Sequence, residues 1–239
     1  MLMDFTVDGV PGVLWTPAGA TGGRPLVLMC HGRSQHKRAD PLVRRAARYV
    51  ERYGWAVAAL DAPGHGDRVT TAEATLTAVK LRRRLAEKRK LDPATAAAAA
   101  QRAAEAVPEW RAALDHLQGL PVVGDAHPVG YWGVSMGTRI GVPLVAEEPR
   151  IVAAVFGLAG LHPGDETLPS AAARVTVPIE FVLQSDDEIV EREAGLALFD
   201  RFGSREKSLH LNPGGHLATP SFEAESWERF FARHLSAAG

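Results

Sequence analysis

Residues 129–137 read VGYWGVSMG, and this short segment says more about the fold than any other part of the chain. Its first five residues, Val129–Gly133, form an apolar run that is typical of a strand buried on both faces of a sheet. A helix is predicted directly after the segment, from Thr138 to Ala146. The segment is therefore predicted to be a sharp strand-to-helix turn with Ser135 at its tip.

Ser135 is a candidate nucleophile because Gly133 and Gly137 flank it in the pattern G-x-S-x-G. Side chains two residues before and after the serine would collide across such a turn, so glycine is favoured at both positions. The free N–H groups that open the next helix favour negative charge beside the serine. Glycine and serine are common, so an ordinary strand–turn–helix junction is the alternative interpretation.

Short β-rich segments alternate with helical segments along the chain, which predicts an α/β fold with a mostly parallel sheet and helices on both faces. Ligands of such sheets bind beyond the carboxyl ends of the strands. The other expected strands are Phe5–Val7, Gly12–Trp15, Pro25–Cys30, Trp55–Leu60, Ile151–Leu158, Ile179–Leu183 and Ser208–Leu211. The other expected helices are Pro41–Tyr53, Ala94–Leu117, Glu191–Phe202 and Ser221–His234.

The composition is that of an ordinary globular protein, with 239 residues, 46% hydrophobic residues and a formal net charge of -1. The length suits a single α/β domain over residues 1–239. The charge gives no sign of affinity for nucleic acid or anionic membranes. No signal peptide and no long apolar run is found, so we expect no membrane span and a cytoplasmic location. Cys30 is the single cysteine, so an internal disulfide and a multi-cysteine metal site are excluded.

A nucleophilic serine needs a base, and the base needs an orienting carboxylate. His216 is the candidate base because it follows a short strand and the glycine-rich loop 212–215, and precedes the last helix. A surface loop histidine is the alternative. The carboxylate is expected after the preceding strand, where Asp186 and Asp187 are adjacent and spacing does not separate them. One would face the histidine, and the other would cap the turn or the next helix.

Taken together, five motifs in order along nearly the whole chain resemble the α/β-hydrolase superfamily, most closely its small dienelactone-hydrolase-like and esterase members. The resemblance implies the α/β-hydrolase fold, and the family's D-x-x-V pattern favours Asp187 over Asp186 as the acid. Dienelactone hydrolases carry a cysteine nucleophile, so Ser135 departs from them and favours esterase chemistry. The motifs are Cys30-His31-Gly32-Arg33, Asp61-Ala62-Pro63-Gly64-His65-Gly66, Gly133-Val134-Ser135-Met136-Gly137, Asp187-Glu188-Ile189-Val190 and Gly214-Gly215-His216.

Acyl transfer also requires backbone N–H donors for the developing oxyanion. The N–H of Met136, next to the nucleophile, is one expected donor, and the resemblance implies the N–H of Arg33 as the other. We therefore expect a serine esterase or lactonase that acts on small molecules through an acyl-serine, without cofactor or metal. An acyltransferase, thioesterase or cofactor-free perhydrolase with the same triad is the alternative, and a non-catalytic ligand-binding protein is a more remote one. The sequence does not indicate the oligomeric state.

A helical insertion is expected at about residues 67–93, next to the motif 61–66 and therefore bordering the entrance to the site. Its cations are interpreted mainly as a solvated helix face, and a lid that favours acidic substrates is the alternative. These cations are Lys80, Arg82, Arg83, Arg84, Lys88, Arg89 and Lys90. Partial burial is expected for Leu76, Val79, Leu81, Leu85 and Leu91. A second excursion, Gly160–Ala173, follows the strand Ile151–Leu158, and the resemblance implies that loops at this place line the acyl pocket.

Overall fold

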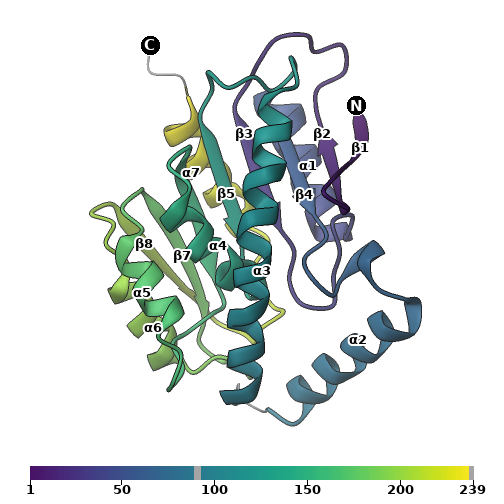
Figure 1. Ribbon diagram of the computed structural model, residues 1–239. Helices are drawn as coiled ribbons and strands as arrows, with labels where there is room; N and C mark the ends of the chain where they lie inside the picture. Colours follow the sequence, from purple (N-terminus) through teal and green to yellow (C-terminus); the bar gives the residue numbers. More distant parts are fainter. Residues whose placement is uncertain (89–92, 237–239) are drawn as a thin grey trace.

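Eight strands form one central sheet in the order β1-β2-β4-β3-β5-β6-β7-β8 (Figure 1). The computed structural model describes residues 1–88 and 93–236. β1 pairs with β2 and β2 with β4 in antiparallel fashion, and every other neighbouring pair is parallel. The predicted mostly parallel sheet is thus confirmed. The strands are β1 Leu2–Val7, β2 Val10–Trp15, β3 Leu26–Cys30, β4 Ala56–Leu60, β5 Val129–Gly133, β6 Ile151–Gly157, β7 Ile179–Gln184 and β8 Lys207–Asn212.

Helices cover both faces of the sheet, as predicted. α1 and α7 pack on one face, and α3, α4, α5 and α6 pack on the other (Figure 1). A short 3₁₀ turn, Gly66–Arg68, leads from β4 towards α2. The helices are α1 Asp40–Tyr53, α2 Thr71–Ala86, α3 Pro93–Gln118, α4 Met136–Glu147, α5 Thr167–Arg174, α6 Arg192–Arg201 and α7 Glu223–Leu235.

α5 is the one helix in the described ranges that was not predicted, because loops were expected in the excursion Gly160–Ala173. The helix is eight residues long and carries Pro169 in its first turn. A short segment with a proline resembles a loop in sequence, although proline is tolerated in the first turn of a helix. The excursion therefore adds a packed helix beside α4, with Leu168 buried.

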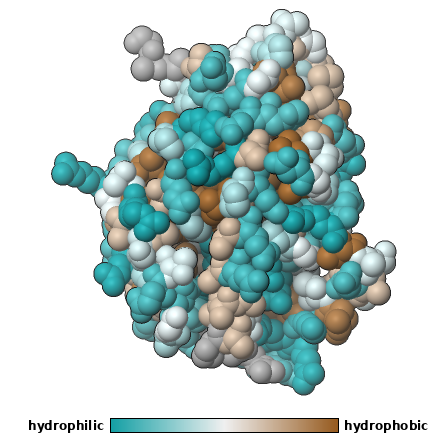
Figure 2. Space-filling model, in the orientation of Figure 1, coloured by the Kyte–Doolittle hydropathy of each residue, from teal (hydrophilic) through white to brown (hydrophobic). Residues whose placement is uncertain are grey.

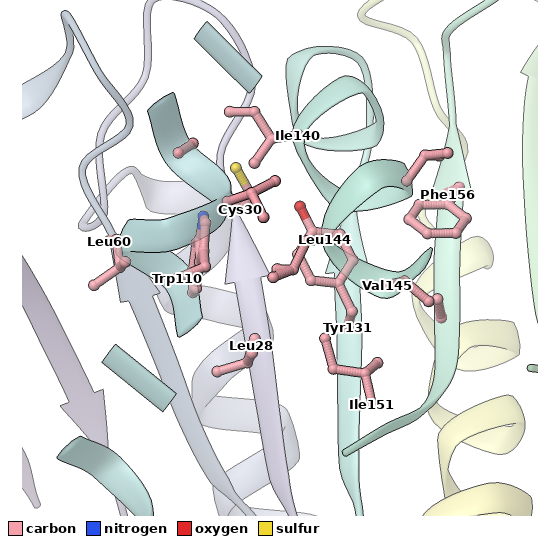
Figure 3. Packing of buried hydrophobic residues seen from close by; sticks show 14 of the residues in the cluster. Leu28, Cys30, Leu60, Trp110, Tyr131, Ile140, Leu144, Val145, Ile151 and Phe156 are labelled. Atoms are coloured by element: carbon pink, nitrogen blue, oxygen red, sulfur yellow. The ribbon is translucent and has the colours of Figure 1, made fainter. Parts of the chain in front are cut away.

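A buried layer between β5 and α4 supports the turn at Ser135 (Figure 3). The fully buried Tyr131 donates its hydroxyl hydrogen bond to the carbonyl of Gly137 at 2.7 Å, and its ring meets that of Trp110 from α3 edge-on. Cys30 lies in the same layer, where burial raises the pKa of its thiol to about 12. These contacts join β3, β5, α3 and α4 directly under the turn.

α2 departs from this layered arrangement and lies out to one side of the sheet (Figure 1). Its first turn is fixed by reciprocal hydrogen bonds between Thr70 and Glu73, but none of its residues is fully buried. Leu81 and Leu85 are half-buried as expected. The expectation is wrong for Leu76 and Val79, which are 53% and 51% exposed, and Figure 2 shows hydrophobic side chains at the surface in this region. The remaining residues of the expected insertion for which we named a role, Arg89, Lys90 and Leu91, lie outside the described residues.

Over residues 1–88 and 93–236, no helix combines the length and the apolar character that a membrane span requires.

Candidate active site

Ser135 occupies a strained position between β5 and α4. Its φ of 59° and ψ of -113° place its backbone outside the conformations that residues other than glycine usually adopt. Its N–H donates to the Gly157 carbonyl at 2.8 Å, which fixes the turn against β6. A Cβ at Gly133 would lie 2.9 Å from backbone atoms of Gly137, so these two positions do collide across the turn. At Gly137 the nearest obstacle to a Cβ is the carbonyl of Cys30 on β3, at 2.8 Å.

The structure brings together the three side chains that were predicted to form a triad. Ser135 Oγ lies 2.9 Å from His216 Nε2, and His216 Nδ1 lies 2.7 Å from Asp187 Oδ2. Ser135 follows β5, Asp187 follows β7 and His216 follows β8, so all three come from carboxyl ends of parallel strands. The histidine and the aspartate are 4% and 6% exposed, whereas the serine is half-buried and open to the cavity.

The two adjacent aspartates have different partners. Asp187 accepts hydrogen bonds from the N–H groups of Ile189 and Val190 at 2.8 and 2.9 Å, in addition to its contact with His216. Burial raises the pKa of the Asp187 carboxyl, but His216 and these two N–H groups lower it more, so the pKa lies below its ordinary value. Asp186 is exposed and accepts a hydrogen bond from the Gly214 N–H at 2.9 Å. Asp187 thus faces the histidine, and Asp186 holds the neighbouring turn.

Glu188 supports His216 in a way that the sequence did not reveal. The His216 N–H donates to Glu188 Oε2 at 2.8 Å. A Cβ at Gly215 would lie 2.3 Å from Glu188 Oε1, so this close approach needs glycine at 215. Glu188 occupies an unspecified position of the D-x-x-V pattern. It lies far from the glycine-rich loop in the sequence, and only the folded structure brings the two together.

Glu223 ties together the two ends of the loop that carries His216. Its carboxylate accepts a hydrogen bond from Asn212 Nδ2 at 2.8 Å and lies 2.8 Å from His210 Nδ1. Glu223 begins α7, whereas the other two residues belong to β8. With Glu180, His210 and Glu223 offer three ligand atoms within 4.8 Å of one another, an arrangement that could hold a metal ion.

The two residues predicted to donate N–H groups to an oxyanion border the same cavity as the triad. Arg33 and Met136 line a cavity of about 390 Å³ together with Ser135 and His216. The loop of Arg33 is braced by His31, which is fully buried and accepts a hydrogen bond from the Ala62 N–H at 3.1 Å through Nε2. The loop and the start of α4 therefore meet at the serine.

A second cavity of about 350 Å³ also reaches Ser135 and His216, on the side of α1 and the loop after β8. Trp132, Leu217 and Trp227 contribute to its lining. The two cavities share Ser135 and His216 in their linings, so both open onto the same pair of side chains.

The basic segment borders the first cavity, as expected from its position after residues 61–66. Lys80, Arg83 and Arg84 all line the cavity. Lys80 and Arg83 are nevertheless exposed, in keeping with the solvated face that we favoured, and Arg84 is half-buried. Arg82 is exposed, in keeping with that interpretation, and the pocket does not include it. The cavity also includes Arg102 and Arg139, from α3 and α4, which the sequence gave no reason to single out.

The chain was compared with known proteins. No protein-family model and no curated protein matches it. A cold-adapted esterase from an Arctic intertidal metagenomic library, in a PEG-bound complex, is 33% identical with a TM-score of 0.76, over 98% of this chain and 93% of that one.

Two further esterases are similar in fold alone. Est1E from Butyrivibrio proteoclasticus, with ferulic acid bound, is 18% identical with a TM-score of 0.66, over 97% of this chain and 98% of its own. The Pyrococcus furiosus esterase Pf2001 is 15% identical with a TM-score of 0.67, over 99% and 93%. The narrower resemblance to dienelactone hydrolases stays a prediction.

The identity to the Arctic protein over almost the full length shows that this chain belongs to the carboxylesterase-like ester hydrolases of the α/β-hydrolase superfamily.

Proposed function

We propose that this esterase cleaves carboxylic esters or lactones of small molecules through a covalent acyl intermediate on Ser135. The observation that carries the proposal is the chain of contacts from Ser135 Oγ to His216 Nε2 at 2.9 Å and from His216 Nδ1 to Asp187 at 2.7 Å. A serine hydroxyl at the tip of a strained turn, beside a base that is itself oriented, is the arrangement that nucleophilic catalysis requires.

In the proposed reaction, Ser135 Oγ attacks the ester carbonyl carbon and His216 Nε2 takes the hydroxyl proton. Asp187 stabilises the resulting imidazolium and keeps the ring in place. The N–H groups of Arg33 and Met136 stabilise the oxyanion, each contributing about 10²–10³ in rate. His216 then returns the proton to the leaving alcohol as the C–O bond breaks. Water, deprotonated by the same histidine, releases the acid and restores Ser135.

The test replaces the proposed nucleophile. We expect Ser135→Ala to lower the rate of hydrolysis of p-nitrophenyl butyrate by on the order of 10⁴-fold or more. A fluorophosphonate probe should label the wild type at Ser135 and leave the variant unlabelled. Ser185→Ala is the matched control, because Ser185 is exposed at the same edge of the sheet and contacts only Asp186 among the described side chains. Equal rates for wild type and Ser135→Ala would refute the proposal.

A further inference from the structure

The first cavity is strongly cationic in a protein whose formal net charge is only -1. Among the described residues that line it, Glu87 is the only acid. The cations come from the loop after β3 and from α2, α3 and α4, so four separate parts of the chain direct positive charge at one cavity. They are Arg33, Lys80, Arg83, Arg84, Arg102 and Arg139.

Arg83 and Arg139 pair with acidic side chains in the part of the chain that the structure describes. Arg83 Nε donates to Glu87 Oε1 at 2.7 Å. Arg139 lies 3.3 Å from Asp165 and also donates to the Gly160 carbonyl at 2.9 Å. The described lining itself holds six cations and one carboxylate, so positive side chains outnumber acids at this cavity.

Arg102 is the most informative of the cations. It is half-buried, and loss of water lowers the pKa of its guanidinium, an effect that Glu105 on the same helix partly offsets. It has no hydrogen-bond acceptor within residues 1–88 and 93–236. Burial lowers the pKa of His65, the Pro63 carbonyl and Asp61 raise it, and the charges of Arg102 and Arg33 lower it, so both cations lie near this histidine. Partial burial of a guanidinium without an acceptor in the protein carries a desolvation cost, and an acceptor on a bound ligand would offset it.

Several of the remaining lining residues are apolar. Leu158, Ala159, Ile189 and Val190 line the cavity together with Ser135. Arg139 follows Ser135 by four residues, or about 6 Å along the helix axis of α4. The cavity therefore offers apolar contacts and positive charge to the same ligand.

We propose that the preferred substrates are esters that carry a carboxylate, joined by a short apolar spacer to the reacting ester group. The carboxylate would accept charge-assisted hydrogen bonds from the guanidinium of Arg102, with Lys80 and the neighbouring arginines adding to the attraction. This inference rests on the proposed function, because it places the reacting ester at Ser135. It adds a substrate class that the triad alone does not specify.

The test compares pairs of esters that differ in charge and little in shape. In the first pair, mono-p-nitrophenyl adipate carries a carboxylate on the acyl side, and the p-nitrophenyl ester of adipamic acid carries a neutral amide at the same position. In the second pair, 4-(butyryloxy)benzoate carries the carboxylate on the leaving group, and 4-(butyryloxy)benzamide is its neutral partner. We expect the anionic member of at least one pair to have a kcat/KM about tenfold or more above its neutral partner, and the pair concerned identifies the side that enters the cavity. About 0.5 M salt should reduce that preference.

Variants of Arg102 identify the source of the preference. Arg102→Met should lower the anionic-to-neutral ratio of kcat/KM about tenfold, and Arg102→Lys should restore a large part of it. Arg82→Met is the control, because Arg82 is an exposed cation on α2 outside the cavity, and its ratio should equal that of the wild type. The salt dependence of the wild-type preference tests, without any substitution, whether positive charge at the cavity causes it.

Two outcomes would overturn the inference. One is a ratio near one for both ester pairs in the wild type, and the other is a preference that Arg102→Met and high salt leave unchanged. Failure of the proposed function looks different, because then the fluorophosphonate would not label Ser135 and the neutral esters would react equally with Ser135→Ala. Labelling at Ser135 with no charge preference would therefore refute this inference alone.

Discussion

The two walls of the cavity at Ser135 are held in place by different amounts of packing. On the sheet side, His216 and Asp187 are almost fully buried and have backbone contacts besides their contact with each other. On the other side, α2 contributes Lys80, Arg83 and Arg84 but buries none of its residues fully. The groups that would perform the chemistry sit on a rigid scaffold, whereas much of the charge lies on an element that packs little. Substitutions in α2 should therefore change selectivity at little cost in stability.

The largest effect is expected from the adjacent carboxylates on the sheet side. Asp187→Asn should lower kcat by on the order of 10⁴-fold, because an amide no longer favours the histidine tautomer that accepts the proton of Ser135. Asp186→Asn is the matched control and should change kcat by less than about threefold, since Asp186 contacts the Gly214 N–H and the Ser185 hydroxyl. Steady-state hydrolysis of a neutral p-nitrophenyl ester measures both. If Asp186→Asn lowered kcat more than Asp187→Asn does, Asp186 and not Asp187 would be the acid that orients His216.

The next largest effect concerns the base of α2, which is anchored far more firmly than the helix itself. Asp61 is fully buried and accepts hydrogen bonds from Lys37 Nζ at 2.7 Å, the Lys37 N–H at 2.8 Å and the Asp67 N–H at 2.9 Å. Asp61→Ala should lower the free energy of unfolding by about 3 kcal/mol or more. It removes one of the two carboxylates that pair with the buried ammonium of Lys37, the other being Asp67, and it leaves two backbone N–H groups without their acceptor. Urea unfolding measures the change. A loss below about 1 kcal/mol would contradict it.

The same aspartate gives the stability a defined pH dependence. Burial raises the pKa of Asp61, but Lys37 and the two backbone N–H groups lower it more, so in the folded protein it lies below the ordinary value of 3.8. The stabilisation is then present above about pH 4 and is lost as the pH falls through the folded-state pKa. Asp61→Asn should accordingly show a smaller loss of stability between about pH 4 and pH 2 than the wild type. If the free energy of unfolding fell equally with pH in both proteins, the titration of Asp61 would make no contribution to the pH dependence.

A smaller effect is expected from Glu188, which positions His216 through its backbone. Glu188→Ala should lower kcat about tenfold, because the loop loses a charge-assisted hydrogen bond at His216. Glu188→Gln should restore part of the rate, since its amide oxygen can still accept the bond. A merely structural role would lower the thermal midpoint and leave the kcat of the remaining folded enzyme unchanged, so both quantities are measured.

Those parts of the fold that depend on local sequence patterns were predictable. Val129–Gly133 was placed with its exact bounds because a buried strand between short turns leaves a continuous apolar run. Ser135 and His216 stood out because glycines mark the turns around them. Asp187 was separated from Asp186 by resemblance alone, since two adjacent residues at a strand end share the same local pattern.

Long-range placement was not predictable in the same way. Arg102 lies in an alanine-rich helix, and nothing local shows that its side of α3 borders the cavity that contains Ser135. Glu188 and Glu223 act across the loop after β8, so their roles depend on the folded path of that loop. Leu76 and Val79 have helical apolar spacing, which predicts a buried face, yet α2 lies away from the sheet.

The smallest effect is expected on that exposed face of α2. The double substitution Leu76→Ser and Val79→Ser should change the free energy of unfolding by less than about 1 kcal/mol, because both side chains are already about half exposed. Ile140→Ala is the buried counterpart, since Ile140 of α4 is 1% exposed, and it should cost about 2–5 kcal/mol. Urea unfolding of both variants compares the two walls directly. A cost for the α2 variant close to that of Ile140→Ala would mean that these side chains are covered in solution, and the contrast between a packed wall and a loosely held one would no longer hold.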